Sequence, residues 1–130
     1  MTHPLHWLLL ALAGGLGTLL RAGCTTLAMR LAGDERGWAA EAATLAINVA
    51  GSFAFGLIYG LTASRQAVPP AWQPIVLVGL LGGFTTYSSF AFQSMMLLNN
   101  HRMAWALAYV AATSLLALAA VWAGLRLAGG

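Results

Sequence analysis

Long stretches without any charged side chain are the feature that most restricts how this chain can fold. Residues 42–64, 66–100 and 103–125 contain no Asp, Glu, Lys or Arg, and residues 5–31 are equally apolar but hold Arg21 near their middle. A helix needs about 20 mostly apolar residues to cross a bilayer. The four stretches therefore predict transmembrane helices that occupy nearly the whole chain.

The alternative is a soluble protein with several buried core helices. Of the 130 residues, 60% are hydrophobic and only 7% are charged, whereas soluble domains are about a quarter charged. So few charged side chains would leave most of a soluble protein's surface apolar. We therefore expect one all-α integral membrane domain over residues 1–130, with helices at about 5–31, 39–63, 72–98 and 103–127.

The connections between the predicted spans are short and polar. Residues 33–37 form the first turn, residues 64–70 form the second with a Pro69-Pro70 pair, and residues 99–102 form the third. Short connections make consecutive spans antiparallel. Both termini and the second connection should therefore lie on the same face of the membrane.

Arginines are almost evenly divided between the two membrane faces. One face would hold Arg65 and Arg126, and the other would hold Arg30, Arg36 and Arg102. Because an excess of basic residues normally fixes orientation, this near-balance has two interpretations. One orientation still prevails, or the protein inserts both ways and two opposite copies form a dimer with its axis in the membrane plane.

The third span contains the most unusual segment, residues 82–90 with the sequence GGFTTYSSF. Glycine loosens a helix, and Ser and Thr side chains compete for backbone carbonyls. We expect a break in this helix near residues 82–86, with a simple kink as the alternative. Backbone groups freed at this depth must be buried in protein or face a polar cavity or ion.

The other spans also carry polar side chains at membrane depth. Arg21 either lines a polar site with Thr18 and Thr25 or extends to the interface, and Asn48 either contributes to a site or joins two helices. In the fourth span Tyr109 and Thr113 share a face with small residues, which fits a packing face and a pore wall equally well.

The predicted spans carry no acidic side chain at their centres and no recognisable catalytic group beside these polar side chains. Asp34, Glu35 and Glu41 lie in a loop or at a helix edge, so no carboxylate relay is predicted, and no nucleophile–base pair indicates an enzyme. The arginines do not cluster as a nucleic-acid site would require. Hydroxyl, amide and aromatic-edge donors without carboxylates favour a pathway for a small anion.

Three motifs resemble those of the fluoride channel family, called Fluc or CrcB. Residues 82–90 resemble its third-helix motif GG-x-TTFSTF. Residues 14–21, GGLGTLLR, are similar to its glycine–arginine motif, and residues 44–53, TLAINVAGSF, are similar to its TL-x-x-N-x-x-G segment. Their order and spacing cover essentially the whole chain.

The resemblance implies a passive, fluoride-selective channel in the cell (inner) membrane, built as a homodimer of oppositely inserted subunits. It also implies a structural sodium ion at the dimer centre, held by the backbone carbonyls of Gly82 and Thr85. Arg21 would have a structural or electrostatic role. The implied fluoride pathway comprises Asn48, Tyr87, Ser88, Ser89, Phe90, Tyr109 and Thr113.

Tyr87 departs from the family pattern, which usually has phenylalanine at this position. Two other functions stay open on composition alone. A small multidrug exporter matches the chain in size, but Arg21 is the only charge at the centre of the first span, where such an exporter carries a glutamate. A non-transporting membrane anchor subunit would leave the expected break in the third span without a purpose.

Overall fold

The computed structural model describes residues 4–33 and 38–129, and every regular element in these ranges is a helix. Four helical segments are long and apolar enough to cross a membrane: Pro4–Ala32, Ala39–Arg65, Pro74–Asn99 and Met103–Gly129. The predicted all-helical protein with four membrane-spanning helices is therefore confirmed. The predicted turn residues Asp34, Glu35 and Arg36 lie outside the described residues.

Three of these segments are single helices: α1 (Pro4–Ala32), α2 (Ala39–Arg65) and α5 (Met103–Gly129). Ser64 is predicted from the sequence to lie in the connection after the second span, but α2 continues one residue beyond it. The Ser64 hydroxyl donates to the carbonyls of Gly60 and Ala128, at 2.9 and 3.1 Å. These bonds hold the last turn of α2 against the end of α5.

The third segment is composed of three elements. It begins with a π-helical stretch, η1 (Pro74–Leu81), followed by the single turn α3 (Gly82–Phe84) and then by α4 (Tyr87–Asn99). Thr85 and Thr86, between α3 and α4, have extended backbones, with φ/ψ of −79°/160° and −149°/118°. The chain resumes a helical path at Tyr87.

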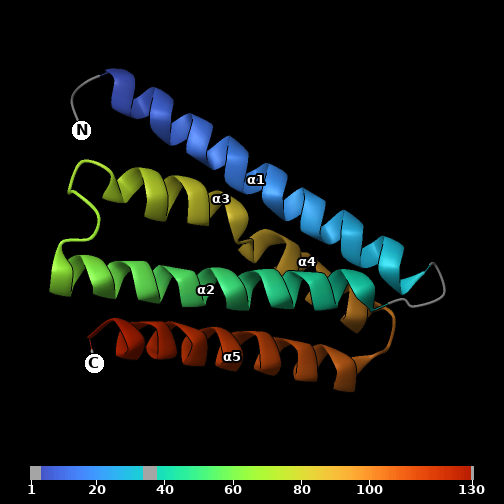
Figure 1. Cartoon of the computed structure of the whole chain (residues 1–130). Helices are drawn as coiled ribbons and strands as arrows, with labels where there is room; N and C mark the ends of the chain where they lie inside the picture. Colours follow the sequence, from blue (N-terminus) through green and yellow to red (C-terminus); the bar gives the residue numbers. More distant parts are fainter. Residues whose placement is uncertain (1–3, 34–37, 130) are drawn as a thin grey trace.

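The helices form two layers. α2 and α5 lie side by side along their length, and α1 packs against η1 and α3 (Figure 1). α1 and the third segment run in the direction opposite to α2 and α5, so the described ends of the chain lie at the same end of the bundle (Figure 1).

Glycines allow the helix backbones to approach closely at both contacts. A Cβ atom on Gly56 would run into the Val121 carbonyl oxygen, and one on Gly17 would lie 2.8 Å from the Phe84 nitrogen. Similarly, a Cβ on Gly83 would meet the Gly14 carbonyl oxygen. Small residues are the usual means of close helix packing in lipid.

Arginine–tryptophan pairs mark the two ends of α5. The Arg102 guanidinium lies 5.6 Å from the Trp105 ring centroid, and the Arg126 guanidinium lies 5.4 Å from that of Trp122. At 1.5 Å per residue the two tryptophans are about 26 Å apart along the helix, close to the roughly 30 Å hydrocarbon thickness of a bilayer. Tryptophan and arginine at these positions are typical of the two membrane interfaces.

Candidate functional site

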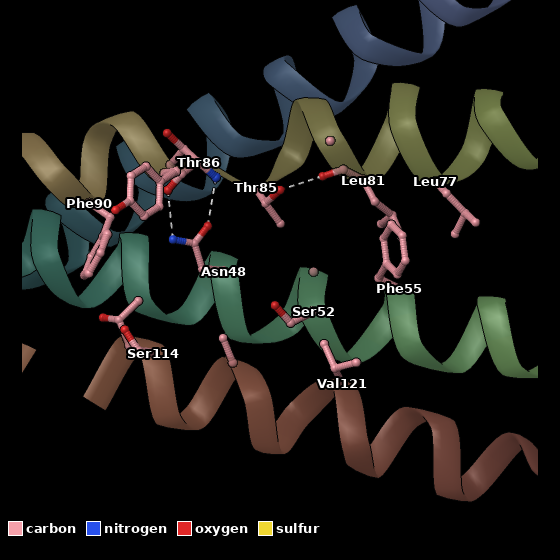
Figure 2. A pocket seen from close by; sticks show the side chains of 15 residues that line it. Asn48, Ser52, Phe55, Leu77, Leu81, Thr85, Thr86, Phe90, Ser114 and Val121 are labelled. Atoms are coloured by element: carbon pink, nitrogen blue, oxygen red, sulfur yellow. Dashed lines mark hydrogen bonds between the residues drawn. The ribbon is translucent and has the colours of Figure 1, made fainter. Parts of the chain in front are cut away.

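A cavity of about 360 Å³ lies at the middle of the bundle, between α2, α5 and the third segment. The extended residues Thr85 and Thr86 form part of its wall (Figure 2). Aliphatic side chains and glycines make up the rest of its wall. Its polar and aromatic lining consists of Asn48, Ser52, Phe55, Thr85, Thr86, Tyr87, Phe90, Thr113 and Ser114.

Asn48 of α2 holds the extended segment by two hydrogen bonds. Its Nδ2 donates to the Thr86 carbonyl at 2.9 Å, and its Oδ1 accepts from the Thr86 N–H at 2.8 Å (Figure 2). A side-chain amide reproduces here the pairing that a neighbouring peptide group would provide. One Nδ2–H of Asn48 is left over from this exchange.

The Thr86 side chain caps the N-terminus of the next helix, α4. Its Oγ1 accepts from the Ser89 N–H at 3.2 Å, which is the N-cap interaction of α4, and it lies 3.1 Å from the Ser89 Oγ and 3.3 Å from the Ser88 Oγ. Thr85 instead turns back and donates through its hydroxyl to the Leu81 carbonyl at 3.0 Å. The Thr85 hydroxyl therefore bonds back to η1, and the Thr86 hydroxyl bonds forward to α4.

These side-chain bonds release two backbone carbonyls. In an uninterrupted α-helix the N–H of residue 86 would donate to the carbonyl of Gly82, and the N–H of Ser89 to that of Thr85. Here the first N–H donates to Asn48 and the second to the Thr86 hydroxyl. The carbonyl oxygens of Gly82 and Thr85 therefore lose the donors that a helix normally provides.

Aromatic rings extend from the cavity wall toward α5. The centroids of Tyr87 and Phe90 are 5.6 Å apart with a 57° angle between the ring planes, and those of Phe90 and Tyr109 are 5.4 Å apart at 54°. In tilted pairs of this kind the electropositive edge of one ring is turned toward the face of the other. Phe90 is buried, whereas Tyr87 is 79% exposed at the mouth of the cavity.

Thr113 contributes a hydroxyl that is not used within the described chain. The residue is buried on α5, it lines the central cavity, and its Oγ1 has no hydrogen-bond partner among the residues that the structure describes. An unpaired buried hydroxyl costs roughly 1–3 kcal/mol. The Thr113 hydroxyl, unpaired in the described chain and beside a cavity, is therefore available to donate to a ligand.

A second cavity of about 410 Å³ lies on the other side of the extended segment, against α1. The half-buried Arg21 reaches it, and the Arg21 Nε is buried without a hydrogen-bond partner in the described chain. Thr86 lines both cavities. The remaining residues of this wall are Thr18, Ala22, Thr25, Thr26, Thr44, Ser89 and Gln93.

The residues predicted from the sequence therefore fall into separate groups. Asn48, Tyr87, Phe90 and Thr113 share the central cavity, together with the backbone segment that contains Gly82 and Thr85. Arg21 and Ser89 line the second cavity, and Ser88 bonds to Thr86 from an exposed position. The structure thus does not place Arg21 among the central group.

Gln93 is a polar wall residue that is not among the site residues predicted from the sequence. Its Oε1 accepts from the Tyr109 hydroxyl at 2.7 Å, so it joins α4 to α5 beside the second cavity. Gln93 lies four residues after Ser89, which places both side chains on one helix face. That spacing was the signal that could have identified it.

Four spans around intramembrane cavities rich in hydrogen-bond donors define a small multi-pass membrane protein of the channel and transporter class, because polar groups at this depth usually mark the passage of an ion or substrate. A family model described as "CrcB-like protein, Camphor Resistance (CrcB)" matches residues 8–125. The chain therefore belongs to the CrcB family, and the resemblance seen in its motifs is confirmed.

Curated relatives cover nearly the full length of the chain. A Paracoccus denitrificans protein is 43% identical over 95% of this chain and 94% of its own length. A Rhodospirillum centenum protein is 40% identical over 92% of each, and a Methylobacterium nodulans protein is 38% identical over 93% of this chain and 94% of its own. All three are named "Fluoride-specific ion channel FluC".

Proposed function

We propose that this protein is a fluoride-specific ion channel, not an enzyme, and that it lets fluoride leave the cell passively across the inner membrane. The name of its full-length relatives supports this function. The observation on the chain itself that carries it is the central cavity, which brings the Thr113 hydroxyl, the remaining Asn48 N–H and two aromatic edges together without a carboxylate.

Fluoride requires such surroundings because it is small and strongly hydrated. A pore must replace its water with donors placed close to the ion, as filters do for other ions. Asn48, Thr113 and the rings of Tyr87 and Phe90 supply donors and electropositive edges in the central cavity. We assign Ser88, Ser89 and Tyr109 to the same pathway, and we assign Arg21 the electrostatic role of attracting anions into the second cavity.

The membrane potential is sufficient to drive export. Hydrogen fluoride crosses lipid as a neutral acid and ionises in the cytoplasm, and an inside-negative potential then favours outward movement of the anion by about 2.3 kcal/mol per 100 mV. Fluoride release from loaded vesicles should therefore follow an imposed potential. Release at the rate of protein-free vesicles would contradict the proposal.

We further propose that the channel is a homodimer of oppositely oriented subunits. Tyr87, Ser88 and Gly82 are exposed at the mouth of the central cavity or beside it, and a polar opening that faces lipid is costly. A second copy would cover it, and the near-equal numbers of arginines on the two faces favour insertion both ways.

Dual orientation can be tested in intact cells with a Cys24→Ser, Ala67→Cys variant, because residue 67 lies in the exposed second connection. A membrane-impermeant maleimide should label about half of the copies, as a twofold axis in the membrane plane requires. Complete labelling, or none, would show a single orientation.

The released carbonyls of Gly82 and Thr85 support a structural sodium ion at the dimer centre. Carbonyl oxygens suit a hard monovalent cation, and two subunits would contribute two such oxygens each. A sodium ion there would supply a fixed positive charge between the subunits. Replacing sodium by N-methylglucamine should lower the melting temperature of the dimer, and an unchanged melting temperature would exclude a resident ion.

Tyr87 tests whether the aromatic edge acts in the pathway. Tyr87→Phe keeps the ring and should keep fluoride efflux near the original rate, whereas Tyr87→Ile removes the electropositive edge and should slow efflux about tenfold. The measurement is efflux from vesicles with equal amounts of each variant. If the two variants conduct alike, the ring has no role in permeation.

A further inference from the structure

A third cavity, of about 320 Å³, lies at the end of the bundle where α2 and α5 begin. We call it the interfacial cavity. Tyr109, which we assign to the fluoride pathway, also lines it. Its wall includes Trp38, Glu41, Leu45, Leu97, Arg102 and Trp105.

The floor of the interfacial cavity is apolar and its rim is aromatic. Leu97 is buried and Leu45 is half-buried, while Trp38 and Trp105 are 52% and 63% exposed. Trp105 also belongs to the arginine–tryptophan pair that marks the membrane interface. A cavity at this level lies where lipid headgroups meet the hydrocarbon region.

Two opposite charges complete the rim. Glu41 lies in the first turn of α2, and Arg102 lies immediately before α5 and is held near the Trp105 ring. Both line the interfacial cavity. Within residues 4–33 and 38–129 no ion pair engages either charge.

We propose that the interfacial cavity binds a zwitterionic aminophospholipid of the phosphatidylethanolamine type. Arg102 takes the phosphate, the Glu41 carboxylate accepts from the primary ammonium, and an acyl chain fills the apolar floor. One cationic and one anionic side chain on the same rim match the two charges of this headgroup. Phosphatidylglycerol offers the phosphate but no cation for Glu41, and a quaternary choline has no N–H to donate.

Lipid binding at this site is tested by tryptophan fluorescence, a readout separate from fluoride flux. A Trp7→Phe, Trp72→Phe, Trp122→Phe background leaves Trp38 and Trp105, both in the cavity wall. The protein is placed in phosphatidylglycerol vesicles into which bromine-labelled phosphatidylethanolamine is titrated, and the reverse titration uses bromine-labelled phosphatidylglycerol in phosphatidylethanolamine vesicles. The bromines quench nearby tryptophans.

Quenching should reach its midpoint at an about fivefold lower fraction of phosphatidylethanolamine than of phosphatidylglycerol, the ratio expected from one charge contact at the interface. Glu41→Gln should remove this preference, and Arg102→Gln should weaken binding of both lipids. Arg126→Gln is the control, since Arg126 lies in the last turn of α5 and does not line this cavity, and it should change nothing.

Several results would overturn the site. Equal midpoints for the two lipids would do so, and so would a preference for phosphatidylethanolamine that persists in Glu41→Gln. Absence of quenching by either lipid would mean that a second copy of the chain covers the cavity. The elution volume and near-ultraviolet circular dichroism of each variant must match those of the parent. A variant that fails this check is replaced by Glu41→Ala or Arg102→Lys, of which the lysine variant should retain part of the preference.

Discussion

Asn48→Leu should abolish fluoride efflux from reconstituted vesicles. Leucine has a similar size but provides neither the donor nor the acceptor that now pairs with Thr86. The Thr86 backbone would lose both partners at the centre of the membrane, and the pathway would lose a donor. Removal of one preorganised donor from a dry site typically costs on the order of 100-fold in rate, so the residual flux should approach that of empty vesicles.

Asn99→Leu is the control for this prediction. Asn99 is exposed at the end of α4, outside the central cavity, so the same chemical change there should leave efflux intact. The Asn48 variant should still be recovered as folded protein with a lower melting temperature, because two hydrogen bonds are lost. Undiminished fluoride efflux by the Asn48 variant would remove this residue from the pathway.

Thr113→Val should lower fluoride efflux about tenfold or more while leaving the protein at least as stable as the parent. Valine has nearly the shape of threonine but lacks the hydroxyl that has no partner within the described chain. Removing an unsatisfied buried hydroxyl should raise the free energy of unfolding, by up to about 1 kcal/mol. Function and stability thus change in opposite directions, which a purely structural threonine would not produce.

Thr62→Val provides the comparison. The Thr62 hydroxyl donates to the Ile58 carbonyl at 2.7 Å within α2, so its loss should leave efflux unchanged and have little effect on stability. The measurements are initial efflux rate and melting temperature on the same preparations. Unchanged efflux in Thr113→Val, or a clear loss of stability, would assign this hydroxyl to packing.

The spans were predictable because lipid imposes a simple requirement on composition. Twenty or more uncharged residues have few alternatives to a transmembrane helix, so the absence of charge over 42–64 and 103–125 was sufficient. The helix ends were less predictable, because they depend on distant contacts. Ser64 extends α2 by bonding to Ala128 on another helix, a contact that local sequence does not reveal.

The candidate site was predictable in its residue types but not in its pairings. Polar side chains at membrane depth, such as Asn48 and Thr113, were visible as exceptions in apolar spans. That Asn48 would bind the Thr86 backbone, 38 positions away, required the packing of α2 against the third segment. Likewise, only the packing of α1 against that segment separates Arg21 from the central cavity.

The π-helical geometry of η1 was not predicted. Its sequence from Pro74 to Leu81 is uniformly apolar, and such a run fits an α-helix equally well. The wider turns accompany the close approach of α1, where a Cβ on Gly79 would lie 3.0 Å from the Leu10 carbonyl oxygen. The π-helical turns of η1 therefore coincide with a tertiary contact to α1 and not with a local preference of the sequence.

The most direct test of the proposed channel compares fluoride with chloride in one preparation. Purified protein in sealed vesicles, with a potential imposed by a potassium ionophore, is supplied with equal concentrations of either anion, and release is followed with ion-selective electrodes. Donors placed for a small ion should conduct fluoride rapidly and leave chloride at the level of empty vesicles. Equal release of both anions, or release of neither, would contradict the account.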